Sequence, residues 1–256
     1  MLWYKSWLDT RWRFLIPLVV LLLNIWGLIF EYPRVAALLH TVQIQPDELS
    51  RTGALGRAIL ESVDAERTYR GYIWYQWFRQ NLSQLGTLFA VLLGSGNLLS
   101  ASPGLGTLFT LSLPRSRTAW LSARAAVALG ESFVLALVPS VAIVLISPLA
   151  GQDYAITDAV VHASCVFVVS AVFFSLAFLL STVFADMWRP LLLAGGVAVV
   201  VSVLESQFAF TGPFSVMAGS TYFTSGAIPW LGLLLSVIVA AGLLWGASIN
   251  VARHDF

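Results

Sequence analysis

The longest uncharged stretch of this sequence is the feature that most constrains its fold. No Asp, Glu, Lys or Arg occurs between Glu205 and Arg253, and shorter apolar runs of the same kind recur along the chain. A helix crosses a bilayer with about 20 apolar residues, so this stretch exceeds one crossing. Charged residues make up 11% of the chain, whereas a soluble domain is about a quarter charged. The composition therefore predicts an all-α integral membrane protein. It argues against a water-soluble enzyme, a secreted disulfide scaffold and a nucleic-acid-binding module.

Several kinds of chemistry are excluded by residues that the chain lacks. Cys165 is the single cysteine, so neither an internal disulfide nor a cysteine-based zinc cluster is possible. The three histidines have no metal-ligand spacing, and we expect no metal or cofactor in this chain. Lys5 is the only lysine, so the phosphate-binding pattern G-x-x-x-x-G-K-[ST] is absent. His162 and Ser248 are expected at opposite membrane surfaces and cannot form a base–nucleophile pair. We therefore do not expect an enzyme.

The gaps between charged residues predict six transmembrane helices. In chain order they cover about 14–30, 82–100, 120–149, 159–185, 190–205 and 229–248. Six spans place both termini on one side, and the short loops on the other side, around 150–158 and 206–228, contain no Lys or Arg. The positive-inside rule then makes both termini cytoplasmic. We expect a multi-pass protein of the cell membrane, with the bacterial inner membrane as its location.

Three further segments are predicted to lie outside these spans. Residues 1–13 form an amphipathic helix on the cytoplasmic surface, with an aromatic stripe on one side; it serves as an interfacial anchor or as a lever that meets a partner. Residues 31–79 form an external segment, and its last aromatic residues are interpreted as an aromatic belt at the bilayer interface. Residues 208–228 are rich in Gly, Ser, Thr and Pro, and dip into the membrane or fold at its surface.

A short uncharged segment between the second and third spans predicts a cytoplasmic helix over 103–113. Leu105, Leu108 and Phe109 recur at helical spacing and form one apolar stripe. Pro114 ends the helix, and two arginines follow it. Because the helix is too short to cross the bilayer, its stripe must be buried in lipid headgroups or in another protein.

The same segment resembles a known family. Gly106-Thr107-Leu108, followed by Leu111-Ser112-Leu113-Pro114-x-Ser116-Arg117, is similar to the G-T-L…L-P-x-S-R segment of ABC-2-type transporter permeases. The opening Trp3-Tyr4-Lys5-x-Trp7…Arg11-x-Arg13-Phe14 resembles the helix before their first span, and Arg124 stands where many members have a basic residue. The chain departs from the family at Ser102-Pro103-Gly104-Leu105, because members usually carry an acidic residue a few positions before G-T.

The resemblance implies the membrane subunit of an ABC exporter. Two such subunits would dimerise around a central path, with a homodimer favoured over a heterodimer. Two copies of a separate ABC ATPase subunit, which carry the ATP and Mg, would each receive the 103–113 helix. The ATPase-coupling residues implied in this way are Leu105, Gly106, Thr107, Leu108, Phe109, Pro114, Arg115 and Arg117.

Polar and ionisable residues inside the predicted spans are costly in a bilayer and are candidate pathway residues. Arg124 and Glu131 are seven residues apart, about 10 Å along a helix, so they cannot pair directly. Arg124 extends to the cytoplasmic headgroups. Glu131 either accepts hydrogen bonds from Asn24 or from serines of neighbouring helices, or it lines a wet cavity. Glu205, at the outer end of the fifth span, is either near water or part of an external gate.

Two classes of function remain open from the sequence. The first is a transport subunit powered by a partner ATPase. The second is a non-transporting membrane scaffold or sensor that binds a partner through the external segment 31–79. The sequence identifies no substrate, because pocket-lining residues cannot be assigned from it.

Overall fold

The computed structural model of the chain describes residues 2–41, 63, 65–96, 117–184, 186–208 and 210–253. Within these ranges the chain is helical apart from short turns, and no strand occurs there, which confirms the predicted all-α class. Five helical stretches in the same ranges are long and apolar enough to cross a membrane: Thr10–Leu39, Ala119–Ala150, Ile156–Ser181, Trp188–Phe208 and Trp230–Ala252. The protein is therefore a multi-pass membrane protein in its architecture.

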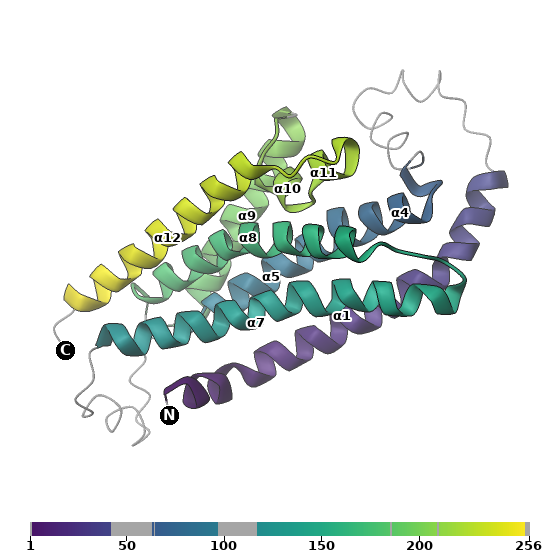
Figure 1. Cartoon of the computed structure of the whole chain (residues 1–256). Coiled ribbons are helices and arrows are strands. Elements are labelled where there is room, and N and C mark those ends of the chain that lie inside the picture. Colours follow the sequence, from purple (N-terminus) through teal and green to yellow (C-terminus); the bar gives the residue numbers. More distant parts are fainter. Residues whose placement is uncertain are drawn as a thin grey trace.

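The long helices form a bundle in which both chain termini lie at the same end (Figure 1). The elements at the opposite end are the short helices α4, α10 and α11, with α10 and α11 stacked above the start of α8. The bounds are α1 Leu2–Thr41, α4 Tyr69–Tyr72, the π-helix η1 Ile73–Leu82, α5 Ser83–Gly94, α7 Arg117–Ile146, the 3-10 helix η2 Ser147–Ala150, α8 Ile156–Ser181, α9 Trp188–Phe208, α10 Pro213–Met217, α11 Ser220–Ser225 and α12 Trp230–Arg253.

The first helix differs from the prediction of a surface helix over 1–13 followed by a span over 14–30. Instead, α1 continues without a break from Leu2 to Thr41 and so extends into the predicted external segment. Its polar stripe faces the protein, because Ser6 and Thr10 are buried, while the aromatic stripe with Trp3 and Trp12 is exposed. This orientation suits a helix whose outer face contacts hydrocarbon, since an apolar solvent takes the apolar side.

The second predicted span, 82–100, corresponds to a longer helical run that begins earlier and ends earlier. The junction residues Ile73 and Ser83 both have helical backbone angles, so α4, η1 and α5 form one run from Tyr69 to Gly94. This run is not among the five apolar stretches, and the count of six spans stays a prediction. Its aromatic residues Trp74, Trp77 and Phe78 are buried in the core, rather than exposed at a bilayer interface as the sequence interpretation had them.

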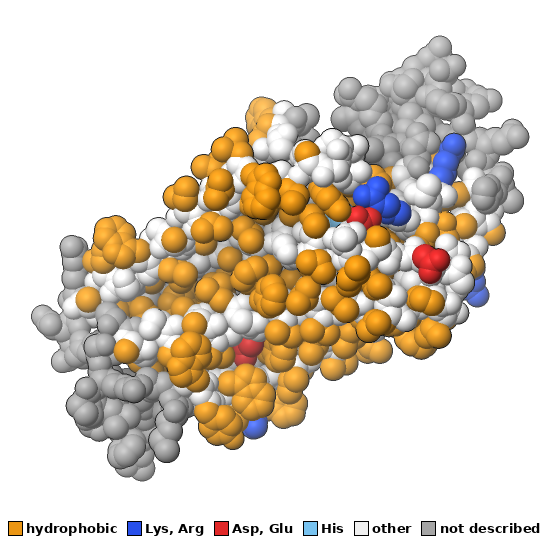
Figure 2. Space-filling model, viewed as in Figure 1, with side chains coloured by type: hydrophobic (Ala, Val, Ile, Leu, Met, Phe, Trp, Pro, Cys, Tyr) orange, Lys and Arg blue, Asp and Glu red, His pale blue; other side chains and the backbone are white. Residues whose placement is uncertain are grey.

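The remaining long helices overlap the predicted spans and expose apolar faces. Figure 2 shows hydrophobic side chains over most of the visible face of the bundle, with few charged groups among them. On α9 and α12 large exposed side chains such as Leu192, Val200, Leu234 and Ile238 point outward. Such faces suit lipid or a partner helix rather than water. The segment 208–228, predicted to fold or dip, forms the two short helices α10 and α11 within its described residues.

Candidate functional site

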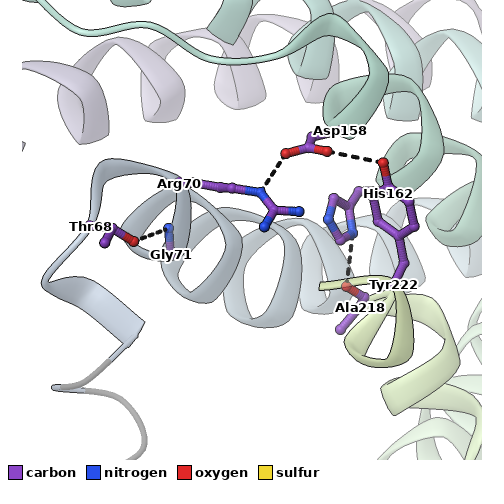
Figure 3. A network of polar contacts seen from close by, with 7 residues as sticks. All are labelled: Thr68, Arg70, Gly71, Asp158, His162, Ala218 and Tyr222. Atoms are coloured by element: carbon purple, nitrogen blue, oxygen red, sulfur yellow. Dashed lines mark hydrogen bonds and ion pairs between the residues drawn. The ribbon is translucent and has the colours of Figure 1, made fainter. Parts of the chain in front are cut away.

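An ion pair and a hydrogen bond to the same carboxylate join three elements at the end of the bundle opposite the termini (Figure 3). Arg70 of α4 donates from Nε to Asp158 Oδ2 of α8 at 2.6 Å, and Tyr222 of α11 donates its hydroxyl to Asp158 Oδ1 at 3.0 Å. Asp158 also lies in the first turn of α8, where the positive end of the helix dipole favours a carboxylate. The pair therefore fixes α4 and α11 to the start of α8.

The turn between α10 and α11 is held by a second set of contacts beside this pair. The carbonyl of Ala218 accepts the indole N–H of Trp74 at 2.9 Å, and it lies 3.1 Å from His162 Nδ1. The His162 ring stacks on Phe78, with a centroid distance of 4.7 Å. Gly219, at φ +64°, follows directly, and a Cβ there would lie 2.5 Å from His162 Nδ1. Only glycine fits this position without a clash or backbone strain.

A groove lies between α1 and the start of the α4–η1–α5 run, with a volume of about 470 Å³. On α1 it is lined by one helix face that carries Asn24, Leu28 and Glu31. Opposite them are Gln76 and Asn81 of η1, together with Tyr72 of α4. We call this the α1–η1 groove. π-Helical segments are rare, and those that occur within α-helices are often found at functional sites. The position of η1 in the wall of this groove therefore supports a functional role.

Hydrogen bonds fix two of the groove's side chains and leave an acceptor open. Tyr72 donates its hydroxyl to Leu28 O at 3.1 Å, and Gln76 donates its amide N–H to Glu66 Oε1 at 2.6 Å. Asn24 Oδ1 is buried and has no hydrogen-bond partner within the described part of the chain. The carboxylate of Glu31 belongs to the lining. The groove is therefore a negatively polarised site with an unused acceptor.

Glu131 lies between α7 and α1, where its carboxylate is 6% exposed. Its Oε1 accepts a hydrogen bond from Thr10 Oγ1 at 2.6 Å, whereas Oε2 has no partner among the described residues. The hydrogen-bonding partner is thus Thr10, and neither Asn24 nor a serine as the sequence had suggested. The structure does not bring Asn24 and Glu131 together, because Asn24 lies in the α1–η1 groove.

Arg124 and Arg13 meet the end of α5. Arg13 donates from Nη1 to Ser95 O at 2.9 Å, and the guanidinium of Arg124 lies against Gly96 and 5.8 Å from the Trp120 ring centroid. Cations at a helix C-terminus are favoured by the helix dipole and by the free carbonyls there. These contacts hold Ser95 and Gly96 at the end of the bundle where the chain termini lie.

Glu205 has a structural role that the sequence did not reveal. Its carboxylate accepts the backbone N–H groups of Phe214 at 2.9 Å and Ser215 at 2.7 Å, at the first turn of α10. A carboxylate in this place satisfies free donors and complements the helix dipole. A Cβ on Gly212 would lie 2.5 Å from the carboxylate, so the glycine makes room for it. Glu205 therefore caps α10 and connects α9 to it.

The predicted coupling residues fall largely outside the described residues. This applies to Leu105, Gly106, Thr107, Leu108, Phe109, Pro114 and Arg115. Arg117 begins α7, and only its backbone belongs to the described structure. By contrast, the sequence reasoning missed Arg70, Asp158 and Tyr222. No local pattern could have found them, because 88 residues separate Arg70 from Asp158 and 64 separate Asp158 from Tyr222.

The fold and these sites define a multi-pass helical membrane protein with polar groups held inside an apolar bundle. No family model, no curated protein and no solved structure matches the chain. The likeness to ABC-2-type permeases consequently depends on the sequence residues given above.

Proposed function

We propose that this chain is the permease subunit of an ABC-2-type transporter, and that it exports a substrate across the cell membrane. The observation that carries the proposal is that two buried acceptors inside the apolar bundle, Asn24 Oδ1 and Glu131 Oε2, have no partner among the described residues. A buried polar group without a partner costs free energy in a bilayer, and such groups mark substrate or ion pathways. The G-T-L…L-P-x-S-R resemblance supports the class of transporter.

The proposed topology has six spans, of which the α4–η1–α5 run supplies the second. That run has 26 residues from Tyr69 to Gly94, a length of about 39 Å at 1.5 Å per residue, which is enough to cross a bilayer. Both termini are proposed to be cytoplasmic. The position of the two chain ends at one end of the bundle supports an even number of crossings.

Cysteine labelling tests this topology. Single cysteines at Ser50 and Ser116, in a Cys165→Ser background, should react with a membrane-impermeant thiol reagent from opposite sides. Cys165 is buried, so the parent protein is itself a low-background control. Labelling of both positions from the outside would contradict the proposed orientation.

Energy for transport is proposed to come from two copies of a separate ATPase subunit, which bind ATP and Mg, while a second copy of this chain completes the membrane dimer. The 103–113 helix is the proposed docking element, and Phe109 is its aromatic anchor. Replacing a packed aromatic anchor in a protein interface costs about 2 kcal/mol or more. Phe109→Asp should therefore dissociate the ATPase or uncouple its hydrolysis, while the permease still inserts and dimerises.

The docking test is co-purification from detergent, followed by measurement of ATP turnover. Thr110→Asp is a matched control, because it adds the same charge on another face of the predicted helix. Arg115→Ala and Arg117→Ala should have milder effects, since exposed ion pairs contribute about 0–1 kcal/mol. Unchanged co-purification and turnover for Phe109→Asp would return the protein to the class of membrane scaffolds and sensors.

A further inference from the structure

The α1–η1 groove has the size of a small-molecule site. Its volume of about 470 Å³ falls in the range of roughly 300–1,000 Å³ that drug-sized ligands occupy. The wall contributed by α1 runs from Leu23, in the middle of its apolar stretch, to Val35 beyond the predicted span. Leu23 is largely exposed on the flank of the bundle, so a ligand could enter the groove from the side that lipid covers.

Two of the groove's lining side chains present hydrogen-bond acceptors that the described part of the chain leaves unused. Asn24 presents a buried carbonyl oxygen with no partner in the described structure. Glu31 presents a carboxylate on the same face of α1, two helical turns after Asn24. No ion pair of Glu31 occurs among the described residues. The hydroxyl of Tyr72 is already donated to Leu28 O. A ligand that fills this groove must therefore bring donors.

The charge of the lining excludes an anionic ligand and favours a cation. Among the described residues of the lining there is no Lys, Arg or His, and Glu31 is the charged member. This carboxylate is exposed, so it attracts an opposite charge and repels a like charge that enters the groove.

The remaining lining is apolar. Leu23, Leu28 and Val35 alternate with the polar residues of the same α1 face, and Gly27 leaves the helix surface open between them, because a Cβ there would meet no atom within 4 Å. A ligand with only polar groups would give these apolar side chains no apolar contact. The lining thus matches a molecule that carries both an apolar body and a cationic donor group.

We propose that the α1–η1 groove binds an amphipathic organic cation, with its cationic group at Glu31 and Asn24 and its apolar body along Leu23, Leu28 and Val35. That such a molecule is the exported substrate rests on the proposed function, whereas the binding itself does not. The same groove excludes organic anions of equal size.

Two probes of similar size and shape but opposite charge test the inference: 4-phenylbutylammonium, which has an apolar body and N–H donors, and 5-phenylpentanoate. Binding of each to the purified full-length chain in detergent is followed by equilibrium dialysis, so neither ATPase nor transport is needed. 4-Phenylbutylammonium should bind saturably, and 5-phenylpentanoate should fail to displace it. Glu31→Gln and Asn24→Leu should each weaken 4-phenylbutylammonium binding by about tenfold or more, the usual size of a lost charge-assisted contact.

Asp153→Asn is the matched control, because it removes an exposed carboxylate outside the groove and should leave binding unchanged. Equal binding of the two probes, an absence of saturable binding, or wild-type affinity in both Glu31→Gln and Asn24→Leu would overturn the inference. A preserved site together with unchanged ATPase association in Phe109→Asp would instead remove the proposed function alone. Lost ATPase association with no cation binding would remove the inference alone.

Discussion

Arg70 and Asp158 form an ion pair with an Nε–Oδ2 distance of 2.6 Å, although 88 residues separate them in the chain. The two side chains differ in environment, because Arg70 is 48% exposed and Asp158 only 10%. Tyr222 shares the same carboxylate, so one acidic side chain holds together elements from three distant parts of the sequence. Removing the arginine would leave a largely buried carboxylate without its charged partner.

A double-mutant cycle should give a measurable coupling for this pair. We expect Arg70→Gln and Asp158→Asn to be coupled by about 1–2 kcal/mol, because the carboxylate is buried although the guanidinium is half exposed. The measurement is thermal unfolding in detergent. Arg189 and Asp186 are the matched control, since their 3.2 Å pair is 70% and 41% exposed and should couple by no more than about 0.5 kcal/mol. Equal coupling in the two pairs would contradict this interpretation.

Two glycines with positive φ should respond differently to alanine. At Gly226, with φ +73°, an added Cβ meets nothing within 4 Å, so Gly226→Ala should cost only the backbone strain of about 1–2 kcal/mol. At Gly219 the added Cβ would also collide with the His162 ring, which packs on Phe78. Gly219→Ala should therefore be the more destabilising variant in thermal unfolding. The prediction fails if the two variants unfold at the same temperature.

The Thr10–Glu131 contact separates a structural role from a pathway role. Glu131→Gln keeps an acceptor for Thr10, so the protein should fold and assemble as before, and a loss of transport in this variant would indicate a pathway role. Glu131→Leu removes the acceptor and should impair assembly. Thr10→Val leaves both carboxylate oxygens unpartnered and should cost about 1–3 kcal/mol in thermal unfolding. Wild-type stability and transport in all three variants would remove Glu131 from either role.

The sequence predicted the helical class and the long apolar helices because these depend on local composition. The run 159–185 contains no Asp, Glu, Lys or Arg, and α8, which covers most of it, carries Asp158 in its first turn. A bilayer leaves such a run few alternatives to a helix. The ends were less accurate, as α1 shows, because its polar and apolar stripes continue on both sides of the predicted breaks. Neither Pro17 nor Pro33 ends the helix.

The candidate sites could be predicted only where one residue suffices. Glu131 was found because a carboxylate in an apolar run is conspicuous by itself, but its partner Thr10 belongs to another helix. The aromatic residues from Tyr69 to Phe78 were interpreted as interfacial, but all except the partly buried Tyr75 lie in the core. Tertiary packing decides whether such a side chain has lipid or protein as its neighbour. The groove needs two helices to exist, so no single stretch of sequence contains it.

The separation of 121 residues between Thr10 and Glu131 has a consequence for the time course of synthesis. At about 5–20 residues per second, a ribosome needs roughly 6–24 s to reach Glu131 after it has added Thr10. During that interval the first helix has no α7 to pack against. Thr10 can hold its hydroxyl on Ser6 O, one turn back at 3.1 Å, so the helix remains internally hydrogen-bonded while it waits. The pace of elongation, rather than the search of one helix for another, should then limit how quickly this pair assembles.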